Sequence, residues 1–245
     1  MQGETMTIDG PRGRFDALVR RPVDAEQGEG PRPAVVVIQE IFGVNHTMVE
    51  VAEGLAANGF YAVVPDLFHQ FEPGIVLDDR KPDELKQAFD YFPRYDVDRG
   101  VEDIRATLEA VRTLPGVNGR VGAVGYCLGG LQAFLTATRT SADAVVSYYG
   151  VNIDAFLGEA DRIAHPLLVH IAGEDQFVPR EAQDRVIAGL KDRPGVEVHR
   201  YEGADHAFAR RAGDHYDAKA ARLADGRTHD FLRQNLDVLG TEGGW

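Results

Sequence analysis

Short apolar runs alternate along the chain with segments in which apolar residues recur at helical spacing. The run PAVVVIQE at 33–40 is almost continuously apolar and β-branched. Such a run is typical of a strand that is buried on both faces of a mostly parallel sheet. The run GRFDALVR at 13–20 predicts an early edge strand. Further strands are predicted over residues 60–66, 120–126, 143–150, 166–173 and 196–203.

The segments between these strands predict helices. Residues 46–58 place their apolar side chains on one side and stop at Asn58-Gly59, and residues 101–114 are amphipathic. Because strands and helices alternate through most of the chain, the sequence predicts an α/β fold, with a mostly parallel central sheet and helices on both faces. We expect one domain over residues 1–245. Other predicted elements are helices over 128–138, 180–191 and 216–236 and a loop over 24–33.

Residues 67–95 do not follow this alternation. The segment is irregular and rich in charged and aromatic residues, and Pro82 begins a short helix. Ligands of open α/β sheets bind at the carboxyl ends of the strands. We therefore expect the segment to form a lid or cap over those ends.

Composition excludes several classes of protein. The 245 residues are enough for one sizeable core, and the formal net charge of −13 argues against binding nucleic acid, which requires a basic surface. The one cysteine cannot form an internal disulfide. The first residues lack the apolar region of a secretory signal, and no apolar run is long enough to span a membrane. We expect a cytoplasmic protein with neither nucleic acid nor membrane as a partner.

The stretch VGAVGYCLGG at 121–130 holds the lone cysteine, Cys127. Its glycines do not have dinucleotide-loop spacing, and no Gly-Lys-Ser/Thr of a P-loop follows. A lone cysteine can simply be a small buried hydrophobe. However, Gly125-Tyr126-Cys127-Leu128-Gly129 has the G-x-nucleophile-x-G form, between a predicted strand and a predicted helix. This pattern predicts a nucleophile elbow, in which the N–H of Leu128 stabilises an oxyanion.

An elbow enzyme carries its nucleophile, acid and histidine in that order. Asp175 follows the strand 166–173 and His206 follows the strand 196–203, so all three side chains are expected at one edge of the sheet. Taken singly, such an aspartate is often only a helix cap, and such a histidine is usually just a polar residue of a surface loop. Together they predict a triad, with His206 as the base and Asp175 orienting it. The other histidines lack metal-ligand spacing, so we expect neither metal nor cofactor.

At this point the sequence resembles the dienelactone hydrolases, a family with the α/β-hydrolase fold, over nearly its whole length. The resemblance is carried by QEIFGVN at 39–45, PDL at 65–67, GYCLGG at 125–130, YYG at 148–150, GEDQFVP at 173–179 and HAFAR at 206–210. It implies opening of a lactone or ester through a cysteine acyl-enzyme that water then hydrolyses, and it places the family's triad on Cys127, Asp175 and His206.

The resemblance also implies roles for other residues. It makes Glu40 a buried glutamate that helps to deprotonate Cys127, Ile41 the donor of the second oxyanion N–H, and Arg210 a ligand of a substrate carboxylate. Alternatively, Glu40 caps its loop or pairs with Arg210. We further expect Phe42, Phe89 and Tyr149 to contact the substrate.

Two positions depart from the family pattern. The family holds the substrate carboxylate with two arginines; Arg210 matches the first, but the second falls on Leu85. Ala207 stands where the family often has serine. Another cation of the 67–95 segment could compensate; the candidates are Arg80, Lys81, Lys86 and Arg94.

The resulting hypothesis is a hydrolase of a small lactone or carboxylic ester, a dienelactone-like substrate expected to carry a carboxylate. We expect its partner to be that small molecule and the protein to be a monomer or weak homo-oligomer. Alternatives are a general carboxylesterase of the same fold and a non-hydrolytic, redox-reactive thiol protein. The last usually has a resolving cysteine, which this sequence lacks. A hydrolase relative used only for binding is a further class, which the complete set of predicted site residues disfavours.

Overall fold

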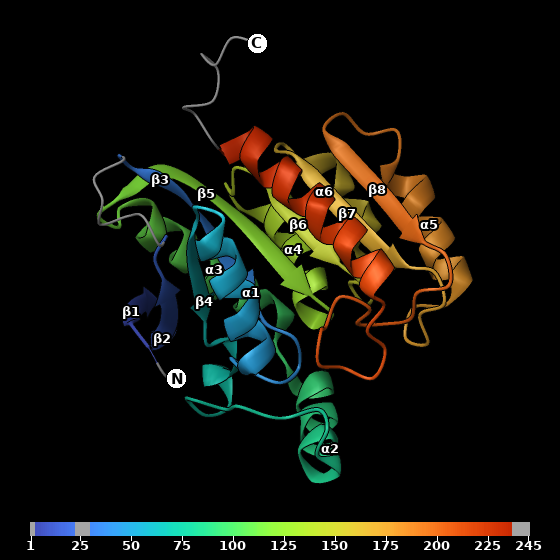
Figure 1. Ribbon diagram of the computed structural model, residues 1–245, viewed down its shortest axis with the longest axis horizontal. Coiled ribbons are helices and arrows are strands. Elements are labelled where there is room, and N and C mark those ends of the chain that lie inside the picture. The colour runs from blue at the N-terminus through green and yellow to red at the C-terminus, as the bar shows by residue number, and fades with distance from the viewer. Residues whose placement is uncertain (1–2, 23–29, 237–245) are drawn as a thin grey trace.

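The computed structural model describes residues 3–22 and 30–236. Most of the predicted loop at 24–33 lies outside the described residues. The described part forms an eight-stranded sheet in the order β1-β2-β4-β3-β5-β6-β7-β8, with β2 antiparallel to its neighbours and the strands from β3 onward parallel (Figure 1). The strands are β1 (Thr5–Gly10), β2 (Gly13–Arg20), β3 (Arg32–Ile38), β4 (Tyr61–Pro65), β5 (Val117–Tyr126), β6 (Val145–Tyr148), β7 (Leu167–Ala172) and β8 (Val196–Tyr201).

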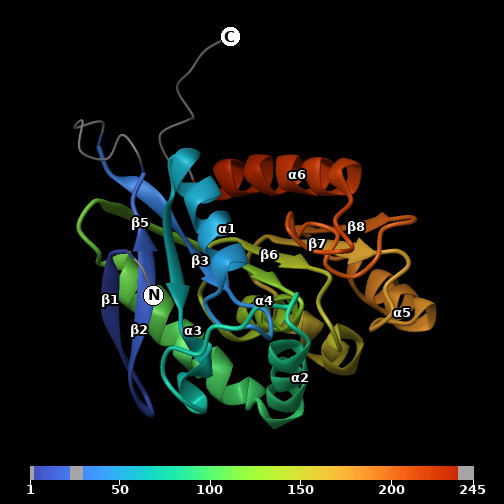
Figure 2. The same cartoon turned by 60° about the horizontal axis from the view of Figure 1, so that its bottom comes forward.

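Helices cover both faces of this sheet, which confirms the predicted fold class (Figure 2). One face carries α1 and α6, and the other carries α3, α4 and α5. The unbroken apolar runs follow from this layering: in β3, Val36 packs into one core and its neighbours Val35 and Val37 pack into the other. The helices are α1 (His46–Ala57), α2 (Pro82–Tyr91), α3 (Val97–Arg112), α4 (Leu128–Arg139), α5 (Arg180–Leu190) and α6 (Ala218–Leu236).

Three features differ from the prediction. Strand β1 was not expected, because Ile8 is its one buried residue and the other positions are exposed or only partly buried. Helix α3 begins four residues before the predicted start, since Asp96 caps it by accepting from the N–H of Arg99. A 3₁₀ segment, Ile153–Arg162, fills a stretch for which no element was predicted.

The segment 67–95 is more ordered than expected. It contains 3₁₀ turns at Leu67–Gln70 and Phe92–Arg94, with α2 between them. A β-bridge between Gly43 and Val76 ties it to the loop after β3. Figure 1 shows α2 beside the ends toward which the parallel strands point. The segment therefore stands where a lid would, although closure stays a prediction.

Candidate active site

Cys127 lies in a sharp turn between β5 and α4. Its backbone has φ 58° and ψ −115°, in the half of conformational space that residues other than glycine rarely adopt. The turn is held by hydrogen bonds: the N–H of Cys127 donates to the carbonyl of Tyr148, and the carbonyl of Cys127 accepts from Gly130 and Leu131. This is the geometry of a nucleophile elbow, at the place where the sequence predicts one.

The glycines on either side of Cys127 let α4 approach the sheet. A Cβ on Gly125 would lie 1.9 Å from the carbonyl oxygen of Gly129, and a Cβ on Gly129 would lie 2.3 Å from the carbonyl oxygen of Ile38. No side chain fits at such distances. The G-x-C-x-G pattern is thus required by the close contact of strand and helix backbones.

His206 and Asp175 are joined by a buried hydrogen bond. His206 Nδ1 donates to Asp175 Oδ2 at 2.8 Å, and the exposed fractions of the two side chains are 6% and 1%. Asp175 Oδ1 accepts from the N–H groups of Phe177 and Val178, which fixes the carboxylate. Because the Nδ1 proton is held by Asp175, His206 Nε2 is the nitrogen free to exchange a proton.

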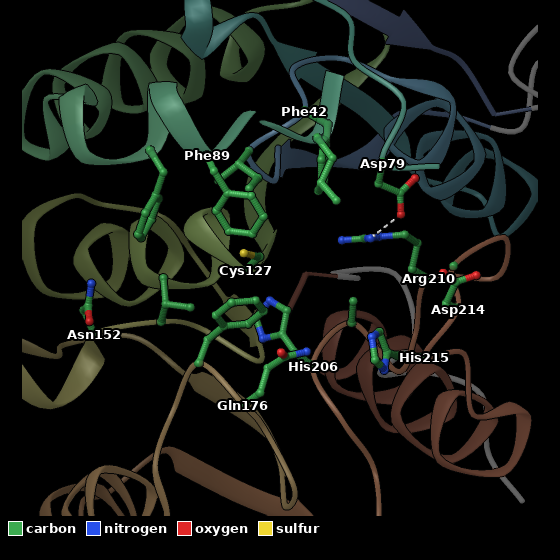
Figure 3. A pocket seen from close by; sticks show the side chains of 17 residues that line it. Phe42, Asp79, Phe89, Cys127, Asn152, Gln176, His206, Arg210, Asp214 and His215 are labelled. Carbon is green, nitrogen blue, oxygen red and sulfur yellow. Dashed lines mark hydrogen bonds and ion pairs between the residues drawn. The ribbon is translucent and has the colours of Figure 1, made fainter. Parts of the chain in front are cut away.

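His206 Nε2 is buried and has no hydrogen-bond partner within the described residues. Figure 3 shows the His206 ring and the Cys127 sulfur together in the pocket. Burial opposes the charged form of His206, but the negative charge of a Cys127 thiolate and the bond to Asp175 outweigh it and raise the pKa of His206 to about 10. A histidine whose charged form is favoured in this way can hold a proton beside Cys127 and release it during a reaction.

The two backbone N–H groups expected to hold an oxyanion belong to Leu128 and Ile41, and this role stays a prediction. Leu128 is the first residue of α4, so its N–H has no acceptor within the helix. Ile41 is on the loop after β3 and lines the same pocket as Cys127. The N-terminal end of a helix attracts negative charge, which suits both a thiolate and an oxyanion.

Glu40 is held by Arg210. Arg210 Nε donates to Glu40 Oε2 at 3.0 Å and Nη2 donates to Oε1 at 2.9 Å, while the Glu40 side chain is 1% exposed. The guanidinium carbon lies 5.1 Å from the centre of the Phe42 ring. Burial opposes the charge of Arg210, but Glu40 more than compensates and raises the pKa of the guanidinium. The structure thus displays the alternative interpretation of Glu40, an ion pair with Arg210.

Arg210 has a second partner that the sequence did not suggest. Its Nη1 donates to Asp79 Oδ2, and this dashed contact is drawn in Figure 3. Asp79 precedes α2, in the segment predicted to be a lid. The contact joins residues that are 131 positions apart, and the one local signal was the charged run Asp78-Asp79-Arg80.

The pocket in front of Cys127 has a volume of about 490 Å³ and mostly apolar walls. Phe42, Phe89 and Arg210 line it, as expected for substrate contacts. Tyr149 does not: it is 2% exposed and packs edge-on against His206, with ring centres 5.2 Å apart. Tyr149 therefore lies against the histidine, and its contact with a substrate stays a prediction.

None of the four candidate cations replaces the family's second arginine. Leu85 lines the pocket, and among the described residues that form its walls Arg210 is the one arginine or lysine. Lys86 is exposed on α2. The other three have partners elsewhere: Arg80 pairs with Asp78, Lys81 pairs with Glu84, and Arg94 lies over the rings of Phe71 and Tyr91.

Within residues 3–22 and 30–236, no three His, Cys, Asp or Glu side chains are grouped so as to hold a metal ion. No helix of that part is both long and apolar enough to cross a membrane.

Comparisons with known proteins place this geometry in a family. The sequence profile of the dienelactone hydrolase family matches residues 15–236. The chain is 41% identical over 218 residues to a carboxymethylenebutenolidase of Pseudomonas putida, covering 89% of this chain and 90% of the relative. It is 36% identical over 225 residues to carboxymethylenebutenolidase 1 of Cupriavidus pinatubonensis, covering 92% and 94%.

A solved structure agrees with the fold. The crystal structure of a dienelactone hydrolase from Anabaena variabilis superimposes with a TM-score of 0.70 at 14% identity, over 96% of this chain and 98% of that one. The resemblance expected from the sequence motifs is therefore confirmed over nearly the whole chain, and the protein belongs to the dienelactone hydrolase family.

Proposed function

We propose that this protein hydrolyses small lactones or carboxylic esters through a thioester acyl-enzyme on Cys127. Family membership and the relatives' activity support a lactone or ester hydrolase. The observation that carries the mechanism is the elbow cysteine beside His206, whose Nδ1 is held by Asp175. The proposed site of action is the cytoplasm, with a small molecule as partner and a monomer or weak homo-oligomer as the enzyme.

In the first half-reaction, the thiol proton of Cys127 passes to His206 Nε2, and Sγ forms a bond to the carbonyl carbon of the substrate. The carbonyl oxygen becomes an oxyanion that accepts from the N–H groups of Ile41 and Leu128. The bond to the leaving oxygen then breaks, and His206 Nε2 gives its proton to the alkoxide. With a lactone, the leaving hydroxyl stays attached to the acyl group, so the acyl-enzyme holds the entire opened ring.

In the second half-reaction, His206 Nε2 takes a proton from water, and the hydroxide attacks the thioester carbon. The C–S bond breaks and the acid leaves, which restores the thiolate and the imidazolium. Asp175 keeps Nδ1 protonated through both steps. Glu40 is proposed to help in generating the thiolate, which requires that its ion pair with Arg210 opens first.

Activated esters test this proposal. In Cys127→Ala, hydrolysis of p-nitrophenyl acetate should fall by about 10³-fold or more, because the nucleophile of a triad is lost. In His206→Ala, the acyl-enzyme should be made slowly and persist, as a mass increase of one acetyl group. His165→Ala is the matched control, since His165 is outside the pocket. The proposal would be refuted if Cys127→Ala hydrolysed the ester as fast as the wild type does. It would also be refuted if the wild type formed a sulfenic acid on Cys127 and did not turn over esters.

A further inference from the structure

Arg210 has two carboxylates already bound to it. All three nitrogens of the guanidinium donate: Nε and Nη2 to Glu40, and Nη1 to Asp79. The side chains of Arg210 and Asp79 are each 11% exposed, so water screens this contact weakly. A substrate carboxylate that approaches Arg210 therefore meets a cation whose strongest hydrogen-bonding directions are occupied.

Two carboxylates face the single positive charge of Arg210, those of Glu40 and Asp79. Elsewhere on the pocket wall, Asp214 is exposed, so water screens its charge, and His206 holds its proton beside Cys127. Leu85, also on the wall, contributes no charge. Like charges that face each other in a partly desolvated pocket repel, which weakens the binding of a ligand with the same charge. An anionic substrate must therefore displace Asp79 from Arg210, or it binds more weakly because the Asp79 carboxylate repels it.

Asp79 is held in place by its backbone surroundings. The preceding residues are fastened to the core, because the N–H of Leu77 donates to the carbonyl of Phe42 at 2.9 Å and Val76 forms a bridge with Gly43. After it, the N–H of Lys81 donates to the carbonyl of Asp78 and closes a turn. Figure 3 shows the carboxylate of Asp79 directed at Arg210 from the edge of the pocket.

The remaining wall suits an uncharged ligand. Its apolar surface comes from the loop after β3, from the segment 67–95 and from the loop after β7. The residues that supply it are Phe42, Leu85, Phe89, Phe92 and Phe177.

We propose that Asp79 is a specificity-determining residue, which occupies Arg210 and biases the pocket toward neutral lactones and esters and against substrates that carry a carboxylate. This inference rests on the proposed function, because it names the substrate class of the same site. It also revises the sequence-based expectation that Arg210 is available to a substrate carboxylate.

The test compares two probes of one shape: a butenolide with a carboxymethylene substituent, and its primary amide, which is neutral. In Asp79→Asn, the amide side chain preserves size and can still accept from Arg210, but the negative charge is gone. The ratio of kcat/KM for the acid to kcat/KM for the amide should rise about 10- to 100-fold, chiefly through KM of the acid. Asp78→Asn, the matched control, should leave the ratio unchanged because Asp78 is outside the pocket wall.

Two outcomes separate this proposal from the proposed function. An unchanged or lower ratio in Asp79→Asn, with the amide still hydrolysed, would overturn the role of Asp79 and leave the hydrolase intact. Absence of turnover in every variant would instead contradict the hydrolase. Calorimetry of both probes with Cys127→Ala protein, with and without Asp79→Asn, measures the same preference as a ratio of affinities and needs no turnover. The role of Asp79 is therefore tested even if no variant hydrolyses the probes.

Discussion

Removal of the Arg210 guanidinium should destabilise the fold through Glu40. In Arg210→Met, a side chain of similar length remains against Phe42, but both oxygens of Glu40 lose the donors that lie 2.9 and 3.0 Å away. The carboxylate is 1% exposed and cannot turn to water. Breaking a buried ion pair by removing one partner costs about 3–5 kcal/mol, because an uncompensated charge is left behind.

That loss is large relative to the total. Domains unfold with a free energy of about 5–15 kcal/mol, so the variant would lose about a fifth or more of its stability. At about 2–4 °C per kcal/mol for a chain of this size, the Tm should fall by about 6–20 °C. Urea denaturation followed by circular dichroism measures the free energy, and a thermal scan measures the Tm.

Two controls decide whether the reasoning is right. Arg80→Met breaks an exposed pair with Asp78 and should leave the free energy of unfolding nearly unchanged. The double variant Glu40→Gln/Arg210→Met removes the orphaned charge and should recover most of the loss. If Arg210→Met lowers the free energy of unfolding no more than Arg80→Met does, the buried pair of Glu40 and Arg210 does not stabilise the fold as proposed. If the double variant is as unstable as the single one, the loss comes from packing on Phe42 and not from charge.

Three further predictions concern the elbow and its partners. Asp175→Asn should lower kcat for ester hydrolysis about 10³- to 10⁴-fold with little change in KM, since an amide stabilises the wrong tautomer of His206; near-normal kcat would contradict the orienting role. Cys127→Ser should lower the pKa of His206 from about 10, so that NMR titration finds the ring neutral at a pH where the wild-type ring is still charged. Gly129→Ala should cost about 1–3 kcal/mol in thermal denaturation, whereas Gly158→Ala, where a Cβ has open space, should not.

The sequence predicts the elements that have a regular apolar pattern and the residues that come directly after predicted strands. Because successive residues of the parallel strands enter two separate apolar cores, their runs are nearly continuous and easily found. The positions of Cys127, Asp175 and His206 follow from the same property, since parallel strands bring their carboxyl ends to one edge.

Features that depend on contacts between distant residues could not be predicted. Strand β1 gains its place by pairing with β2 and has almost no apolar pattern of its own. The contact of Asp79 with Arg210 needs the ordered turn before α2, and nothing local distinguishes Asp79 from its neighbour Asp78. The packing of Tyr149 against His206 could not be predicted either, because a sequence shows which residue follows a strand but not which way its ring turns.

The strained backbone at Cys127 lowers the stability of the fold at the position where the proposed reaction needs a side chain. A residue other than glycine at φ 58° and ψ −115° stores about 1–3 kcal/mol of strain, at the one position where the proposed chemistry needs a side chain. A glycine there would relax the turn, so Cys127→Gly is expected to raise the Tm while it abolishes hydrolysis. Selection of this protein for thermal resistance alone would then discard its nucleophile first, and only continued selection for turnover would keep the cysteine in the turn.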